Sequence, residues 1–142
     1  MRQTVPPTVL VVEDDGDLRQ IITDSLEARG FAVAQALTAA DAHSRLEAFA
    51  YDGMVIDLGL PDADGLDVLD EALTRYPQMR CVVVTGWGGA PEAVRAIKRG
   101  AIDFMIKPFQ LVQLAQVLEA GINERRLQAE NAALHARLGD RL

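Results

Sequence analysis

Residues 8–15 have the sequence TVLVVEDD, in which an apolar run of strand length is followed at once by three carboxylates. A run without polar alternation indicates a strand covered on both faces, because a strand with one wet face would alternate apolar and polar residues. Comparable runs follow at 53–56, 81–84 and 102–106, the last interrupted by Asp103. The sequence therefore predicts a buried, mostly parallel sheet.

The segments between these runs have the spacing of amphipathic helices, with apolar residues on one face. The repeating apolar positions are Leu18, Ile21, Ile22 and Leu26; Ala39, Ala42, Leu46 and Phe49; Leu66, Leu69 and Leu73; and Val94 and Ile97. Gly30, Thr38, the pair Tyr76-Pro77 and Gly100 mark where these helices begin or end. Residues 31–34 form the one remaining, weakly marked strand. Five alternations of strand and helix predict an α/β fold with helices on both faces of the sheet and right-handed crossovers.

Polar side chains follow four of the five predicted strands. They are Glu13, Asp14 and Asp15 after the first strand, Asp57 at the end of the third, Thr85 after the fourth and Lys107 after the fifth. In the flavodoxin-like, doubly wound strand order 2-1-3-4-5, the second strand lies at an edge and the other four are neighbours. This order brings the four polar ends into one crevice, where ligands bind in such sheets. We therefore predict a flavodoxin-like (βα)5 fold with a parallel five-stranded sheet and an extended C-terminal helix.

These residue types suit a hard cation and phosphoryl transfer. Several carboxylates in a shallow site favour Mg²⁺, with Mn²⁺ as an alternative, and Glu13 and Asp14 are the expected ligands. Asp57 can attack as a carboxylate nucleophile and form an acyl phosphate. Lys107 would supply a compact positive charge to the phosphoryl oxygens, and the Thr85 hydroxyl would bond a remaining oxygen.

Four segments resemble the signature segments of response-regulator receiver domains, the CheY-like superfamily of two-component signalling. They are residues 11–15, 57–65, 84–86 and 107–108, and the resemblance spans about residues 8–122 in order. By position, Glu13 and Asp14 resemble the acidic pair, Asp57 the phosphoacceptor, Thr85 the switch hydroxyl, Phe104 the switch aromatic and Lys107 the invariant lysine. The resemblance also implies a metal ligand at the Asp57 carboxylate and the Gly59 backbone carbonyl, and a cis bond before Pro108. Phe104 has a second interpretation as an ordinary core residue.

In the family that these segments resemble, the positions of Gly59 and Trp87 border the phosphoryl group and influence how long it survives. Gly59 has no side chain to orient an attacking water, and Trp87 is bulky enough to exclude one. We predict slow self-dephosphorylation. Alternatively, Gly59 serves backbone geometry and Trp87 belongs to a partner-binding surface.

The C-terminal segment has its own pattern. We divide the chain into a receiver domain at residues 1–122 and a helical extension at 123–142. Leu127, Asn131, Leu134 and Leu138 follow the spacing of a short coiled-coil seam, in which a buried asparagine can fix the register. The alternative is a solvated helical tail. We expect a homodimer through this helix or through the face of the fourth and fifth helices, or else a linker to an output domain.

Composition narrows the classes of function. The formal net charge is −7, and residues 1–71 hold 15 acidic and 4 basic residues, which argues against nonspecific nucleic-acid binding. No helix-turn-helix is apparent, so we expect no direct nucleic-acid partner. The chain has no apparent signal peptide or membrane span, and its single cysteine suits a reducing compartment, so we expect a cytoplasmic protein.

Three functions remain in competition. The first is a response-regulator receiver that takes a phosphoryl group from a histidine kinase or phosphotransfer protein and switches a protein–protein interface. Such a chain would be no enzyme beyond catalysing its own phosphorylation and dephosphorylation. The second is the regulatory front part of a longer transcriptional regulator. The third is a Mg²⁺-dependent aspartyl-phosphate phosphatase, which Gly59 disfavours because such hydrolases generally carry a second aspartate there.

Overall fold

The computed structural model describes residues 5–86 and 88–139 and contains five alternating strands and helices in these ranges. The strands are β1 (Thr8–Val12), β2 (Ala32–Ala36), β3 (Gly53–Asp57), β4 (Arg80–Thr85) and β5 (Asp103–Ile106). The helices are α1 (Gly16–Ala28), α2 (Ala39–Ala48), α3 (Gly65–Arg75), α4 (Ala90–Arg99) and α5 (Leu111–Gly139). The weakly marked second strand begins and ends later than predicted, at Ala32 and Ala36 rather than at residues 31–34.

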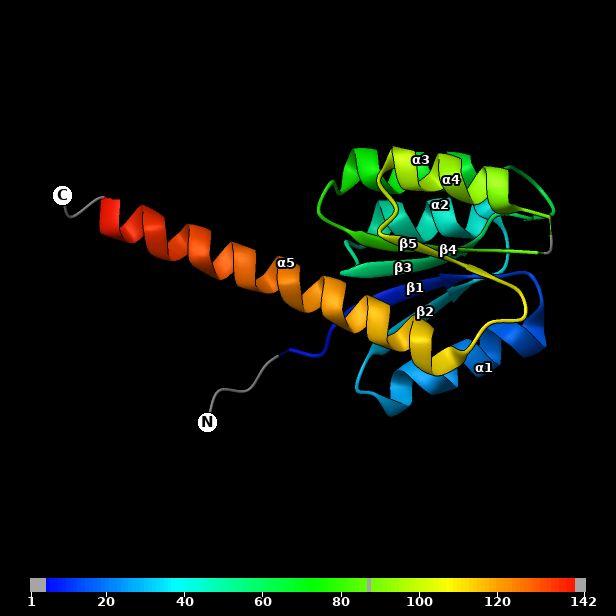
Figure 1. The fold of residues 1–142 in the computed structure, drawn as a ribbon, viewed down its shortest axis with the longest axis horizontal. Coiled ribbons are helices and arrows are strands. Elements are labelled where there is room, and N and C mark those ends of the chain that lie inside the picture. The colour runs from blue at the N-terminus through cyan, green and yellow to red at the C-terminus, as the bar shows by residue number, and fades with distance from the viewer. Residues whose placement is uncertain (1–4, 87, 140–142) are drawn as a thin grey trace.

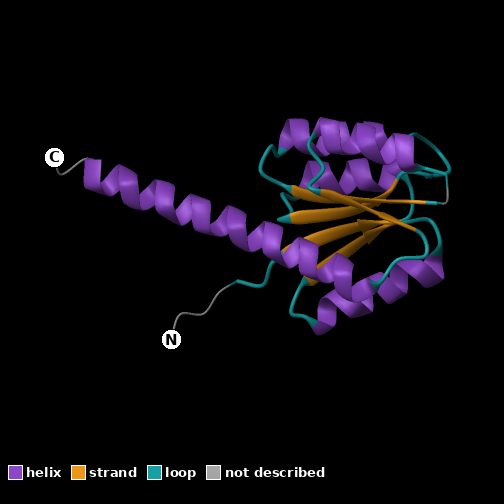
Figure 2. Cartoon of the chain, viewed as in Figure 1, coloured by secondary structure: helices purple, strands orange, loops and turns teal. Residues whose placement is uncertain are grey.

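All neighbouring strands pair in parallel, in the order β2-β1-β3-β4-β5. Helices α2, α3 and α4 cover one face of the sheet, and α1 and the first part of α5 cover the other (Figures 1 and 2). The predicted flavodoxin-like order and doubly wound arrangement are confirmed. Because every crossover returns the chain to the same end of the sheet, all carboxyl ends of the strands lie together at one edge.

The sheet separates two apolar cores. One lies under α2, α3 and α4 and includes Leu10, Ile56 and Leu69, which are fully buried. The other lies under α1 and α5 and includes Val11 and Leu118, also fully buried. Successive residues of the central strands feed opposite cores, which explains why these strands carry no polar alternation.

The predicted helix boundaries are confirmed, but several residues that were predicted to lie on the buried helix faces are exposed. Thr38 caps α2 by accepting a hydrogen bond from Asp41 N, Tyr76 caps the end of α3 and Gly100 ends α4.

Four of the large residues assigned to buried helix faces are instead exposed: Ile21, Phe49, Val94 and Ile97. On α4 the small residues Ala93 and Ala96 are the fully buried ones instead. Val94 and Ile97 consequently point to solvent.

Helix α5 continues well past the sheet. It leaves the body at the amino ends of the strands, opposite the crevice, and projects into solvent (Figure 1). Asp52, just before β3, anchors its exit: Arg125 Nη1 lies 3.3 Å from Oδ1 and Arg126 Nη2 lies 3.3 Å from Oδ2. Within the described residues, no helix combines the length and apolar character needed to cross a membrane.

Candidate functional site

The carboxyl ends of β1, β3, β4 and β5 bring the predicted polar residues to one edge of the sheet. Asp57 is the last residue of β3 and pairs in register with Val84, so Thr85 lies one position beyond it on the neighbouring strand. Lys107 follows β5 directly, and its backbone N–H donates to the Thr85 carbonyl at 2.8 Å. The convergence predicted from strand order is thus present.

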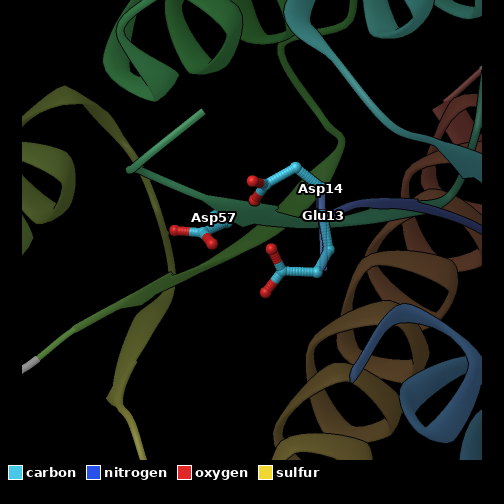
Figure 3. A group of neighbouring side chains, drawn as sticks. All are labelled: Glu13, Asp14 and Asp57. Atoms are coloured by element: carbon cyan, nitrogen blue, oxygen red, sulfur yellow. The ribbon is translucent and has the colours of Figure 1, made fainter. Parts of the chain in front are cut away.

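Three carboxylates gather at the centre of this edge. One oxygen each of Glu13, Asp14 and Asp57 lie within 4.8 Å of one another. Figure 3 shows their carboxylates turned to the same side, from the ends of β1 and β3. Glu13 and Asp57 are buried, whereas Asp14 is exposed. The cluster is therefore open to solvent on the Asp14 side.

Lys107 balances the two buried carboxylates. Its Nζ donates to Asp57 Oδ2 at 2.8 Å and lies 2.9 Å from Glu13 Oε1. Glu13 Oε1 is buried, and the Lys107 ion pair is its close polar contact among the described residues. One ammonium shared by two buried carboxylates, with a third carboxylate beside them, leaves an excess of negative charge that favours a further cation at this edge.

The pKa values of the three groups reflect this crowding. Burial and the proximity of Asp57 raise the pKa of Glu13 to about 8, although Lys107 opposes the shift. Burial would also raise the pKa of Asp57, but Glu13, Lys107 and the Gly59 N–H together outweigh it and lower that pKa. Desolvation of Lys107 is likewise outweighed by the two carboxylates, which raise its pKa. Without a metal, Asp57 is thus the ionised carboxylate and Glu13 holds a proton near neutral pH.

The loop after β1 is held by a residue that the sequence analysis did not single out. Arg19, on the first turns of α1, donates from Nη1 to the Glu13 carbonyl at 2.8 Å and from Nε to Gln35 Oε1 at 2.9 Å. Asp15 caps α1 by accepting from Asp17 N and Leu18 N. These contacts hold the loop backbone from Glu13 to Asp15. An arginine one turn into a helix carries no sequence signal for such a role.

Glycines shape the other side of the site. The Gly59 N–H donates to Asp57 Oδ1 at 2.8 Å, and a Cβ at Gly59 would lie 3.5 Å from that oxygen, in ordinary contact. At Gly65, by contrast, a Cβ would lie 2.6 Å from Leu58 Cα and 2.7 Å from the Asp57 carbonyl oxygen. Gly65 therefore lets α3 begin directly against the backbone that carries Asp57. The sequence does not show that Gly65 is needed for this close packing of two backbone segments.

The switch roles of Thr85 and Phe104 stay predictions. Thr85 is buried at the end of β4, and Phe104 is half-buried on β5, packed against the core under α2, α3 and α4. The peptide bond between Lys107 and Pro108 is cis, as the resemblance implied. Trp87 lies outside the described residues.

The comparison with known families agrees with this geometry. The sequence profile of the "Response regulator receiver domain" matches residues 9–119. The chain belongs to the response regulator receiver family. The predicted family, fold and general function as a two-component signalling receiver are confirmed.

Known relatives of this receiver are mostly longer proteins. It is 39% identical over 129 residues to the C4-dicarboxylate transport transcriptional regulatory protein DctD of Rhizobium meliloti, covering 90% of this chain and 28% of that protein. The crystal structure of NtrX from Brucella abortus superimposes with a TM-score of 0.84 at 32% identity, over 92% of this chain and 30% of that one. A CheY-like receiver from Methanospirillum hungatei gives a TM-score of 0.82 at 25% identity, over 87% of this chain and 99% of that chain. This chain therefore spans under a third of the first two relatives.

Proposed function

We propose that this receiver accepts a phosphoryl group on Asp57 from a histidine kinase or phosphotransfer protein in the cytoplasm, and then switches a protein–protein interface. The observation that carries the proposal is the environment of Asp57: a buried, ionised carboxylate that contacts Lys107 at 2.8 Å and adjoins two further carboxylates. A simple structural ion pair would not require a second buried carboxylate on the same ammonium. The chain would catalyse only its own phosphorylation and dephosphorylation.

The residues divide the chemistry between them. An Asp57 oxygen attacks the phosphorus of the donor, forming an O–P bond while the bond to the donor's leaving atom breaks and its electron pair stays with that atom. Lys107 remains charged, because two carboxylates raise its pKa, and neutralises the phosphoryl oxygens. The Gly59 N–H orients the attacking carboxylate through its hydrogen bond to Oδ1. The Thr85 hydroxyl then bonds a phosphoryl oxygen.

Glu13, Asp14, Asp57 and the Gly59 carbonyl are the proposed ligands of Mg²⁺ or Mn²⁺. The oxygen-only donor set and the three carboxylates gathered around a single ammonium fit such an ion. When bound, the ion would neutralise charge on the transferring phosphoryl group. Glu13 would give up its proton to serve as a ligand, so the occupied site differs in charge from the metal-free one.

The first test is the intact mass of the protein after incubation with acetyl phosphate and Mg²⁺. We expect the gain of one acid-stable, base-labile phosphoryl group on wild type. Asp57→Asn should abolish the gain because the nucleophile is removed, and so should chelation of the metal. A phosphoryl group of the same stability on Asp57→Asn would contradict the assignment.

The lifetime of the phosphoryl group tests the proposed roles of Gly59 and Trp87. With no side chain at Gly59 to orient a water, we expect slow spontaneous loss from wild type. Trp87→Ala should accelerate loss by about tenfold if the indole excludes water, a modest barrier change of about 1.4 kcal/mol. The decay of the phosphorylated mass after removal of the donor measures both rates. Fast decay of wild type, unchanged in Trp87→Ala, would defeat the shielding hypothesis.

A second proposal concerns the larger protein context. The leucines of the predicted seam, Leu127, Leu134 and Leu138, are all about half exposed on α5, where they offer an apolar stripe to another helix. DctD is named a transcriptional regulatory protein, and this chain spans 28% of it. We therefore propose that residues 123–142 dimerise or link the receiver to an output domain, with the α4–α5 face as an alternative dimer surface.

A further inference from the structure

The end of β4 and the start of α4 meet at an unusually close contact. Gly89 is the N-cap of α4, and its φ of −86° and ψ of 13° are accessible to any L residue. A Cβ at Gly89 would nevertheless lie 1.9 Å from Thr85 Oγ1 and 2.9 Å from both Thr85 Cβ and Cγ2. Real Cβ atoms essentially never approach other atoms closer than 3.0 Å. This arrangement of Thr85 therefore requires glycine at position 89 for space, not for backbone freedom.

The Thr85 side chain is otherwise uncommitted. It is 7% exposed, and its hydroxyl makes no hydrogen bond with any described residue. Gly89 contributes no side-chain cap to α4, and its N–H donates to the Gly86 carbonyl at 3.0 Å. A hydroxyl that no protein group bonds gains from a rearrangement that supplies a charge-assisted partner. The nearby phosphoryl site on Asp57 would supply such a partner.

We propose that Gly89 is a positioning residue for the Thr85 switch: it provides the space in which Thr85 rests against the start of α4 while Asp57 is unphosphorylated. The inference rests on the proposed function of Thr85 as the residue that bonds the phosphoryl group. A side chain at position 89 removes this resting place. Rotation about the Thr85 side chain alone cannot relieve the contact, because Thr85 Cβ is itself only 2.9 Å away, so the strand end and helix start must move apart.

A substitution at position 89 would change the equilibrium between the two arrangements of Thr85, and through it the affinity for a phosphoryl mimic. A substitution that destabilises the resting arrangement but not the phosphorylated one raises the population of the latter, and any ligand that prefers it then binds more tightly. Gly89→Ala should therefore favour the state in which Thr85 faces Asp57. Gly86→Ala provides a matched control in the same loop, because a Cβ at Gly86 would meet nothing within 4 Å and its φ is not positive.

The experiment is calorimetric titration of the full chain with beryllofluoride, a phosphoryl mimic, in the presence of Mg²⁺. We expect Gly89→Ala to bind about fivefold more tightly than wild type, and Gly86→Ala to match wild type. In a Thr85→Ala background the effect of Gly89→Ala should become smaller, because Oγ1, which would lie only 1.9 Å away, and Cγ2 are gone and only the 2.9 Å contact with Cβ remains. Equal or weaker binding by folded Gly89→Ala, or an effect of undiminished size in the Thr85→Ala background, would overturn the proposal.

Two further readouts keep the test decisive. If Gly89→Ala does not fold, the double variant Thr85→Ala with Gly89→Ala should regain a cooperative thermal transition, and failure to do so counts against the proposed contact. If wild type binds no beryllofluoride, the proposed phosphoacceptor function fails separately. The Thr85 methyl resonance of the metal-free protein then decides: it should shift in Gly89→Ala and stay in place in Gly86→Ala, and equal spectra would refute the resting place.

Discussion

Glu13 and Asp14 are neighbours in sequence with opposite surroundings. Glu13 is 2% exposed and its carboxylate lies next to that of Asp57 and the ammonium of Lys107, whereas Asp14 is exposed. Without a metal, ionising Glu13 costs free energy because its carboxylate is buried, whereas the Asp14 carboxylate lies in solvent. A site of this kind stores an electrostatic penalty that cation binding can relieve.

The raised pKa of Glu13 predicts how stability depends on pH in the metal-free protein. Its pKa is about 8 when folded and 4.5 ordinarily, so between these values the folded state holds a proton that the unfolded state lacks. Stability is then fully present below about pH 4.5 and is lost as pH rises toward 8. The lowered pKa of Asp57 acts in the opposite sense, but only below its ordinary 3.8. The raised pKa of Lys107 acts in the same sense as that of Glu13, but only above its ordinary 10.5.

Thermal unfolding in a chelating buffer measures this effect. We expect Tm to fall by roughly 3–8 °C between about pH 5 and pH 8, for a loss of 1–2 kcal/mol. Glu13→Gln should flatten the dependence, because the titrating proton is gone. A Tm that falls equally in both proteins would show that another group is responsible.

At the scale of elements, the start of α3 is fixed by contact with the strand that carries Asp57. Asp64 caps the helix by accepting from Leu66 N, and Gly65 packs against the backbone of Asp57 and Leu58. The helix and the strand that carries Asp57 thus share a backbone interface with no side chain between them. Movement of one element requires movement of the other.

Gly65→Ala tests this interface. Its Cβ would lie 2.6 Å from backbone atoms, which cannot rotate away, so we expect a loss of about 2–3 kcal/mol in the free energy of unfolding. Gly16→Ala, at the first residue of α1, serves as the control because its Cβ meets only Arg19 Nη2 at 3.7 Å. Urea denaturation of both variants measures the difference. Similar stabilities would mean that the α3 start shifts at little cost.

At the scale of the whole molecule, the site and the exposed helix lie at opposite ends. The crevice is at the carboxyl ends of the strands, and α5 departs from the amino ends, held by Asp52 through Arg125 and Arg126 (Figure 1). A signal from Asp57 to the seam must therefore pass through the packed sheet and helices rather than by direct contact. Alternatively, the α4–α5 face would be the dimer surface, and the signal from Asp57 would travel a shorter distance.

Self-association tests the seam. We expect wild type to dimerise and Leu134→Lys to weaken the dimer by at least about tenfold, because a charge would be buried between helices. Ala136→Lys adds the same charge to an exposed position off the seam and should leave the dimer intact. Sedimentation equilibrium, with and without a phosphoryl mimic, measures each association constant. Wild type that stays monomeric at high concentration in both conditions would exclude the seam.

The sequence by itself determined the strand order, the layer arrangement and the meeting of Glu13, Asp14, Asp57, Thr85 and Lys107, since unbroken apolar runs and the polar residues that end them are local features that parallel topology brings together. Only tertiary structure decided what depends on distance between remote segments. Examples are the clamp of Arg19 on the Glu13 carbonyl, the exposure of Val94 and Ile97 and the space that Thr85 takes from Gly89. These follow from how closely two elements approach, which depends on every side chain between them and leaves no periodic mark in the sequence.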